Sequence, residues 1–299
     1  MKVQLNYSFW ACSLLVVSAL VAACEQPAEA LIDRKRRENE TEINQYITQN
    51  NLTATKTAEG VYFIQTKSIP TAQAPKTGDE VRYRYVARRL DGVIVDSSNT
   101  DPATIILAGN STTGITLGRY AGILKLRQGE EGAVLVPADL DGGRVGTLLL
   151  PQYSPVRYDL SLISVRTENQ QIQDYITANK LTVTTLTSDS IRVVKTLVQP
   201  TDSVAITTGK TVTMNYTGRR ASNGVVFDSG TGFQVKIGEK RTVTGFENGL
   251  TNLRAGEKAK LIFPSTLGYG VQGSPNQDPA KNLLPYTPLV FDIEITKVQ

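Results

Sequence analysis

Histidine is absent from the chain of 299 residues, and cysteine occurs only twice. Without histidine the chain lacks the commonest metal ligand and the commonest general base. Zinc sites built on Cys/His spacing are excluded, because Cys12 and Cys24 cannot supply such a set. The formal net charge is only +4, which argues against a nucleic-acid-binding surface made by charge alone. We therefore expect neither a metal site nor a nucleic-acid partner.

The N-terminus has the pattern of an export signal. Lys2 precedes an apolar stretch of about 15 residues, Phe9–Ala23, which is short for a membrane span and typical of a signal peptide. Small residues directly before Cys24 fit the lipobox of bacterial lipoproteins, in which this cysteine is acylated. We expect residues 1–23 to be a signal peptide and Cys24 to hold the protein by a lipid anchor in the cell envelope, on the periplasmic or surface side. Ordinary cleavage that leaves a free thiol and a transmembrane anchor are the alternatives.

A short polar segment follows the predicted anchor. Residues 24–33 are predicted to be a tether, and basic residues continue from it at Arg34–Arg37. Such a run close to a lipid can contact anionic headgroups. It is also typical of the solvated start of a helix, which is the interpretation that we favour.

An internal repeat at an offset of about 130 residues divides the rest of the chain. The repeated motifs are Ile-X-X-Tyr-Ile-Thr and Gly-X-X-Val, found at Ile43–Thr48 and Ile172–Thr177, and at Gly78–Val81 and Gly209–Val212. This period is too long for a solenoid and suits a duplicated domain. We predict two domains, 34–166 and 167–299, each with an N-terminal helix.

Most of each repeated unit has the alternation of apolar and polar residues that is typical of β-strands. In the second unit Val212, Met214 and Tyr216 alternate with polar neighbours. Each unit also ends in a strongly apolar segment, such as Leu289–Ile295. Both units are therefore predicted to be mainly sheet.

One helix interrupts the predicted strands of the second unit. Thr244–Glu247 matches a capping box, which would begin the helix. Phe246, Leu250 and Leu253 then fall on one helix face, and Gly256 is the expected stop. Strands with a single helix predict the α+β fold class, an antiparallel β-sheet packed on one short α-helix in each unit.

Five motifs of the second unit occur in the order and spacing of the FKBP-type peptidyl-prolyl isomerases. They are Asn215–Gly218, Gly224–Ser229, Val243–Gly249, Gly268–Gly270 and Leu289–Asp292. Residues 209–299 resemble that family over nearly their whole length. The resemblance implies two FKBP-like domains, since the units repeat, and prolyl isomerase activity in the second.

The resemblance also implies a shallow aromatic pocket for proline. Phe246 stands where family members often carry tryptophan, so the floor stays apolar but becomes smaller. The implied catalytic residues are Tyr216, Phe227, Asp228, Phe246, Tyr269 and Phe291, and the further substrate-binding residues are Phe233, Val243 and Leu284.

The chemistry of prolyl isomerisation suits these residue types. Rotation about an X–Pro bond makes and breaks no covalent bond, so it needs no metal, cofactor or titrating base. The resemblance implies proline-containing polypeptides as partners, folding in the cell envelope, and competition by a macrolide inhibitor. Because aromatic residues in strands are usually core, a non-catalytic FKBP-like binding, assembly or chaperone lipoprotein is the alternative.

The first unit keeps the pattern of the second but loses the pocket. Tyr85, Asp96 and Tyr158 are retained. Where the second unit has Phe227, Phe233, Phe246 and Tyr269, the first has Val95, Ala103, Arg119 and Gly142. Because an arginine on an apolar floor is costly to bury unless it is paired, we predict that residues 34–166 are a degenerate domain without isomerase activity.

Overall fold

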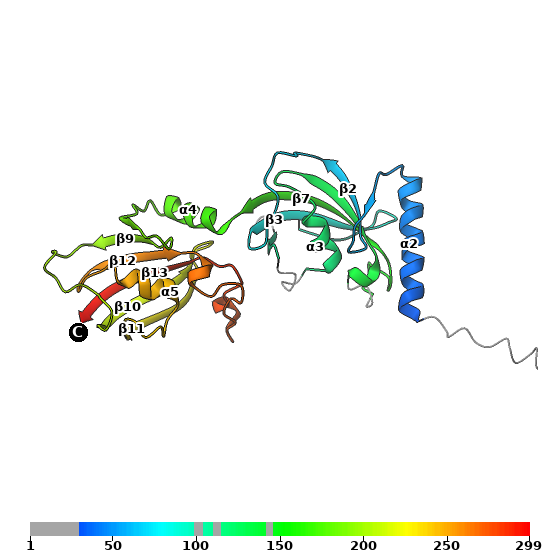
Figure 1. The fold of residues 1–299 in the computed structure, drawn as a ribbon. Coiled ribbons are helices and arrows are strands. Elements are labelled where there is room, and N and C mark those ends of the chain that lie inside the picture. Colours follow the sequence, from blue (N-terminus) through cyan, green and yellow to red (C-terminus); the bar gives the residue numbers. More distant parts are fainter. Residues whose placement is uncertain (1–29, 99–103, 110–114, 142–145) are drawn as a thin grey trace, which may run out of the picture.

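The computed structural model describes residues 30–98, 104–109, 115–141 and 146–299, which form two units, each built on one antiparallel sheet (Figure 1). Short helices lie against the sheets, so the predicted α+β fold class is confirmed. The predicted signal peptide 1–23 and Cys24 lie outside the described residues. Within the described part, no helix is both long and apolar enough to cross a membrane.

The N-terminal unit, residues 31–166, contains a seven-stranded sheet in the order β1-β2-β6-β7-β3-β4, with β5 also paired to β3. Its helix α2 begins at Leu31, inside the segment predicted to be a tether. The elements are α2 (Leu31–Gln49), β1 (Thr55–Lys56), β2 (Tyr62–Lys67), β3 (Glu80–Arg89), β4 (Ile94–Ser97), β5 (Thr104–Leu107), α3 (Leu117–Ile123), β6 (Glu131–Val136), the 3-10 turn η1 (Ala138–Leu140) and β7 (Val156–Arg166).

The C-terminal unit, residues 167–299, contains a six-stranded sheet in the order β11-β10-β13-β12-β9-β8. Taken from its other edge, this order is β8-β9-β12-β13-β10-β11, which matches β1-β2-β6-β7-β3-β4 of the first sheet strand by strand. The two units therefore share one topology. The elements are α4 (Glu168–Ala178), β8 (Thr185–Leu186), β9 (Arg192–Leu197), β10 (Thr211–Arg220), β11 (Val226–Lys236), α5 (Thr244–Leu250), β12 (Lys258–Phe263), the 3-10 turns η2 (Ser265–Leu267) and η3 (Pro279–Lys281), and β13 (Leu289–Val298).

Helices cover both faces of the C-terminal sheet. From Phe291 to Ile295, strand β13 alternates buried and partly exposed residues, because successive side chains of a strand point to opposite faces. Helix α5 packs on the inner face, which carries the main core. Helix α4 covers one end of the outer face, where Ile172 and Ile176 pack with Ile262 and Val290. In the N-terminal unit α2 covers the outer face in the same way. The inner face beside α5 carries the aromatic residues of the candidate site.

Helix α5 begins without the predicted capping box. Its N-cap is Val243, and no side chain caps the first turn. The carboxylate of Glu247 instead accepts a hydrogen bond from the Gly238 N–H at 2.6 Å. That bond ties the helix to the end of β11, and it removes the glutamate from Thr244, so the capping-box prediction is wrong.

The predicted apolar face of α5 is confirmed for Phe246 and Leu250, but the predicted helix end is wrong, and Leu253 lies beyond the helix. Phe246, Leu250 and Leu253 are all buried in the core of the C-terminal unit. The helix ends at Leu250, before Gly256, which adopts a positive φ of 81° in the turn that leads into β12. Gly256 therefore belongs to the turn before β12 and does not end the helix.

Candidate active site

Three buried aromatic rings pack together on the inner face of the C-terminal sheet. We call the surface beside them, where the resemblance implies a proline pocket, the cup. The ring centroid of Phe246 on α5 lies 4.9 Å from that of Phe291 on β13, and Phe227 on β11 lies 5.6 Å from Phe291. Both pairs meet edge to face, which brings the positive edge of one ring to the negative face of the other. The exposed fractions are only 3% for Phe246, 6% for Phe227 and 4% for Phe291. These three rings, which come from three separate elements, form the apolar floor that we assign to the cup.

Two further residues allow this floor to form. A Cβ atom at Gly218 on β10 would lie 2.8 Å from the Phe227 ring and 2.9 Å from the Phe291 ring, so only glycine leaves room for both. Phe263 on β12 is fully buried and stacks behind Phe291 with centroids 5.8 Å apart. The resemblance assigns no role to Phe263. The position of Phe263 in an apolar strand predicts only a core residue.

The rim of the cup is polar on the β10–β11 side. The Tyr216 hydroxyl donates a hydrogen bond to Oδ2 of Asp228 at 2.9 Å, and Oδ1 of Asp228 accepts one from the Ser229 N–H at 2.9 Å. The Tyr216 ring also packs against Phe233 with centroids 5.3 Å apart. Phe233 is 36% exposed, so an apolar edge remains open to a bound chain. Asp228 is thus held in one orientation beside an aromatic opening.

Tyr269 and Val243 each carry a hydrogen-bond donor for which the described residues supply no acceptor. Tyr269 lies in the turn after η2, with its ring centroid 6.4 Å from that of Phe227. Its hydroxyl donates no hydrogen bond to another described residue. Val243, the N-cap of α5, packs partly buried against the same core, and its N–H also donates to none of the described residues. Both groups are therefore available to the carbonyl oxygens of a substrate.

Leu284 is an exposed residue of the loop before β13. Its side chain is 47% exposed, whereas the neighbouring Leu283 is 4% exposed and belongs to the core cluster of the cup. The residues brought together are Tyr216, Phe227, Asp228, Phe233, Val243, Phe246, Tyr269 and Phe291.

The rim hydroxyls stay protonated well above neutral pH. Burial, with the hydrogen bond to Asp228, raises the pKa of Tyr216 to about 12. Burial and the nearby charge of Asp228 raise the pKa of Tyr269 in the same direction. Both tyrosines can therefore donate hydrogen bonds throughout the physiological range. Among the described residues, no group of three or more acidic or cysteine side chains could hold a metal ion.

The aromatic cup lies within a segment that matches a known family. Residues 203–296 match the family model described as FKBP-type peptidyl-prolyl cis-trans isomerase. FK506-binding protein 1 of Saccharomyces cerevisiae is 41% identical over 95 residues, which are 30% of this chain and 78% of the yeast protein. The chain belongs to the FKBP-type peptidyl-prolyl isomerase family.

Other FKBP proteins match a longer part of the chain. Peptidyl-prolyl cis-trans isomerase FKBP9 of Homo sapiens is 27% identical over 244 residues, 79% of this chain and 38% of the human protein. The crystal structure of the three FKBP domains of wheat FKBP73 covers 83% of this chain and 99% of its own, at 20% identity and a TM-score of 0.39. The chain spans only 19% to 38% of the length of several curated FKBP relatives.

The N-terminal unit of this FKBP-family chain has an arginine where the cup floor would lie. The Tyr85 hydroxyl donates to Asp96 at 2.6 Å, as Tyr216 does to Asp228. The guanidinium carbon of Arg119 lies 4.2 Å from the Tyr85 ring centroid and 5.5 Å from that of Tyr158, as expected for cation–π contacts. A charged group therefore stands among these rings, and Ala103 and Gly142 lie outside the described residues.

A partly buried carboxylate completes this polar cluster of the N-terminal unit. The Tyr158 hydroxyl donates to Asp141 at 2.7 Å, and the Thr116 hydroxyl donates to the same oxygen at 2.6 Å. Burial raises the pKa of Asp141, although both hydrogen bonds and the charge of Arg119 oppose the rise. The N-terminal unit thus has a guanidinium and a carboxylate beside Tyr85 and Tyr158.

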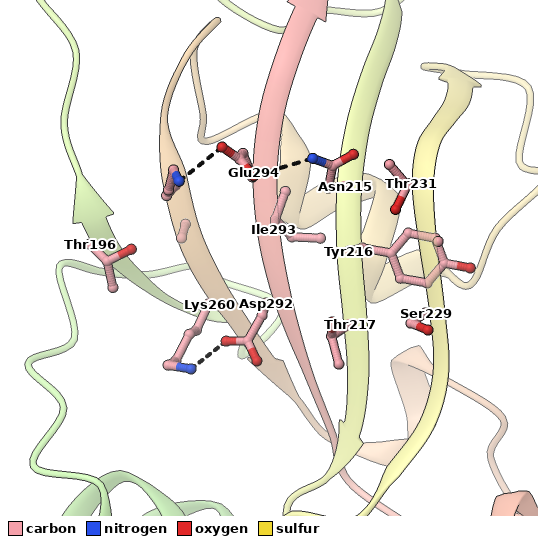
Figure 2. A pocket seen from close by; sticks show the side chains of 13 residues that line it. Thr196, Asn215, Tyr216, Thr217, Ser229, Thr231, Lys260, Asp292, Ile293 and Glu294 are labelled. Atoms are coloured by element: carbon pink, nitrogen blue, oxygen red, sulfur yellow. Dashed lines mark hydrogen bonds and ion pairs between the residues drawn. The ribbon is translucent and has the colours of Figure 1, made fainter.

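A separate hollow of about 650 Å³ lies on the outer, polar side of the C-terminal sheet (Figure 2). Lys258 pairs with Glu294 at 2.8 Å, Lys260 pairs with Asp292, and the Asn215 amide donates to Glu294 at 3.2 Å. The charged side chains of this wall are already paired with one another. We therefore place the candidate site in the aromatic cup and not in this hollow.

Proposed function

We propose that the C-terminal unit catalyses cis-trans isomerisation of X–Pro bonds in polypeptides. The observation that carries the proposal is the apolar floor of Phe227, Phe246 and Phe291 beside the polar rim of Tyr216 and Asp228. The barrier to rotation is about 18–20 kcal/mol, because the planar amide is stabilised by resonance. Twisting the bond removes that resonance and much of the group's polarity, so an apolar cup binds the twisted form better than the planar form.

The polar rim supports the same step. The hydroxyl of Tyr269 and the N–H of Val243 can hold the carbonyl groups that flank the proline while the bond rotates. Each tenfold acceleration requires about 1.4 kcal/mol of preferential binding to the twisted form, so a millionfold acceleration requires about 8 kcal/mol. Contact with a buried aromatic floor, together with two or three hydrogen bonds, can supply a binding free energy of this magnitude.

A protease-coupled assay on a prolyl peptide tests this function in the soluble chain 25–299. We expect isomerisation well above the uncatalysed rate, and we expect a macrolide of the kind that binds FKBP proteins to compete with the peptide. An observed rate equal to the uncatalysed rate at micromolar protein would refute catalysis.

We propose that the N-terminal unit is a degenerate FKBP-like domain without turnover. Its strand order, its Tyr85–Asp96 hydrogen bond and the extent of the match to human FKBP9 support the shared fold. The guanidinium of Arg119 beside Tyr85 and Tyr158 supports the loss of the cup. A chain that keeps full turnover after the C-terminal cup has been disabled would contradict this assignment.

We further propose that the protein is a lipid-anchored component of a bacterial cell envelope, where its clients are exported proteins that fold slowly at proline. The lipobox and Cys24 support this location. Cys24→Ser should release the protein from membranes or block its maturation. A wild-type protein that fractionates as soluble and carries no acyl mass would exclude the anchor.

A second candidate is a non-catalytic binding or chaperone protein. The filled cluster around Arg119 favours it, because one of the two units already lacks an open cup. Binding of unfolded clients without any acceleration of prolyl isomerisation would identify this function.

A further inference from the structure

A tyrosine of the C-terminal unit packs on a backbone turn of the N-terminal unit. Gly78, just before β3, has a φ of +92°, and a Cβ atom placed on it would lie 2.9 Å from Cδ1 of Tyr286. The tyrosine ring therefore rests directly on the Gly78 backbone. In Figure 1 the loop before β13, drawn in dark orange, is the part of the C-terminal unit that reaches toward β3.

The turn beneath the ring is firmly held. The Gly78 N–H donates to the Ala108 carbonyl at 2.8 Å, and the Ala108 N–H donates to the Asp79 carbonyl at 2.9 Å. The carboxylate of Asp79 is buried and accepts a hydrogen bond from the Lys76 N–H at 2.9 Å. These bonds close the turn on both sides, so it presents a rigid surface to Tyr286.

Tyr286 is tied in turn to the loop that carries Tyr269. The Tyr286 N–H donates to the Gly270 carbonyl at 3.0 Å, and the Gly273 N–H donates to the Tyr269 carbonyl at 3.1 Å. Tyr286 also has a positive φ of 57°, which is uncommon for a bulky residue and must be held by its surroundings. A displacement of the Tyr286 ring would therefore be transmitted to the loop that carries Tyr269 through the Tyr286–Gly270 hydrogen bond.

The internal repeat provides a matched position without this contact. Gly209 before β10 has a φ of +86°, and its N–H donates to the Ile237 carbonyl at 2.9 Å, as Gly78 does to Ala108. The turn geometry explains a glycine at both positions. However, a Cβ atom at Gly209 would meet nothing within 4 Å, so the close contact belongs to Gly78.

Further bonds hold the two units together at their junction. Arg166, the last residue of β7, pairs with Asp174 of α4 at 2.9 Å and donates from Nε to Glu80 of β3 at 3.0 Å. The Gln170 amide also donates to the Gln73 side chain at 3.4 Å. One arginine thus links the start of β3, which follows Gly78, to the first helix of the C-terminal unit.

We propose that the N-terminal unit is an intramolecular support for the loop that carries Tyr269, and that Tyr286 is the positioning residue through which it acts. This inference rests on the proposed isomerase function of the C-terminal cup. The support reduces the conformational freedom that the loop must lose when a substrate binds. A unit without a working cup thereby increases the affinity of its neighbour for substrate.

Four single substitutions in the soluble two-unit chain test the support. Tyr286→Asn removes the ring and keeps a residue that tolerates the left-handed backbone, and we expect KM to rise about five-fold with kcat changed less than about two-fold. Tyr286→Phe keeps the ring and should behave as wild type. Gly78→Ala places a methyl group against the ring and should raise KM about three-fold. Gly209→Ala carries the same backbone strain with open space around it, and it should leave KM within about two-fold of wild type.

A double variant shows whether Gly78 acts through the tyrosine. In a Tyr286→Asn background, Gly78→Ala should cause no further rise in KM, because the ring that it displaces is absent. An equal rise in both backgrounds would overturn the proposal, as would an unchanged KM in Tyr286→Asn.

Hydrogen exchange separates this inference from the proposed function. Amides of residues 268–288 should exchange faster in Tyr286→Asn than in wild type or Tyr286→Phe, whether or not the chain turns over substrate. Absence of turnover in the wild type would refute the isomerase function. The exchange comparison would still show whether the N-terminal unit supports the loop that carries Tyr269. Equal exchange in the three chains would overturn the support.

Discussion

Truncation of the floor residue Phe246 should reduce both the stability and the activity of the C-terminal unit. The side chain is 3% exposed, and its ring centroid lies 4.9 Å from that of Phe291 and 5.8 Å from that of Tyr216. For such a side chain, replacement by alanine costs about 3–5 kcal/mol in the free energy of unfolding. In a unit of this size the melting temperature should fall by roughly 10–20 °C. Urea unfolding and calorimetry measure both quantities.

A matched substitution on the same helix separates the pocket from the core. Leu250 is fully buried in the same cluster but does not line the cup, and Leu250→Ala should cost a similar 2–5 kcal/mol, roughly. Turnover should be measured well below both melting temperatures and corrected for the folded fraction. We expect Leu250→Ala to retain near wild-type kcat/KM and Phe246→Ala to lose about ten-fold or more. Equal losses in the two variants would refute the assignment of Phe246 to the floor.

Three other predictions concern single groups. Tyr269→Phe should leave stability unchanged and lower kcat/KM several-fold, because one hydrogen bond to the substrate contributes about 1 kcal/mol; a wild-type rate would show that this hydroxyl does not contact the substrate. Because burial and Asp228 raise the pKa of Tyr216 to about 12, the stability linked to its proton is complete below about pH 10, where unfolded tyrosine ionises, and is lost as the pH rises toward 12. Tyr216→Phe should therefore weaken the alkaline loss of stability in pH-dependent melting, and an unchanged profile would contradict this linkage. Glu257→Ala should cost about 3 kcal/mol in urea unfolding, because the buried carboxylate accepts from Lys195 at 2.9 Å and from the Arg254 N–H at 2.9 Å; a loss below about 1 kcal/mol would mean that solvent replaces the carboxylate as the acceptor for these two donors.

Periodic patterns in the sequence predict the parts of the fold that depend on burial. The alternation at Val212 and Met214 places both side chains in the core, and the helical spacing of Phe246 and Leu250 does the same. These features follow from one strand or one helix packing against a sheet. They need no knowledge of distant contacts.

Local hydrogen-bond choices are harder to predict, because several partners compete for one side chain. The spacing of Thr244 and Glu247 fits a capping box, yet Glu247 bonds to the Gly238 N–H that the fold brings near. In the loop before β13, Leu283 is buried and Leu284 is exposed, and the role of Leu284 stays a prediction.

Comparison of the two repeats predicts more of the site than either repeat alone. Alignment through flanking glycines assigns Arg119 to the position of Phe246, and the structure places the arginine beside Tyr85 and Tyr158. The contact between Tyr286 and Gly78 has no such signal in the sequence. It depends on how two units pack against each other, which no local pattern or internal repeat encodes.

Catalysis at the C-terminal cup is tested most directly by matched substitutions of the two tyrosine-bound aspartates. Asp228 and Asp96 accept equivalent hydrogen bonds from Tyr216 and Tyr85, so Asp228→Ala and Asp96→Ala perturb the two units in the same way. In the protease-coupled assay, we expect Asp228→Ala to lower kcat/KM about ten-fold or more and Asp96→Ala to leave it within about two-fold of wild type. Equal activity in the two folded variants would contradict a site in the C-terminal cup.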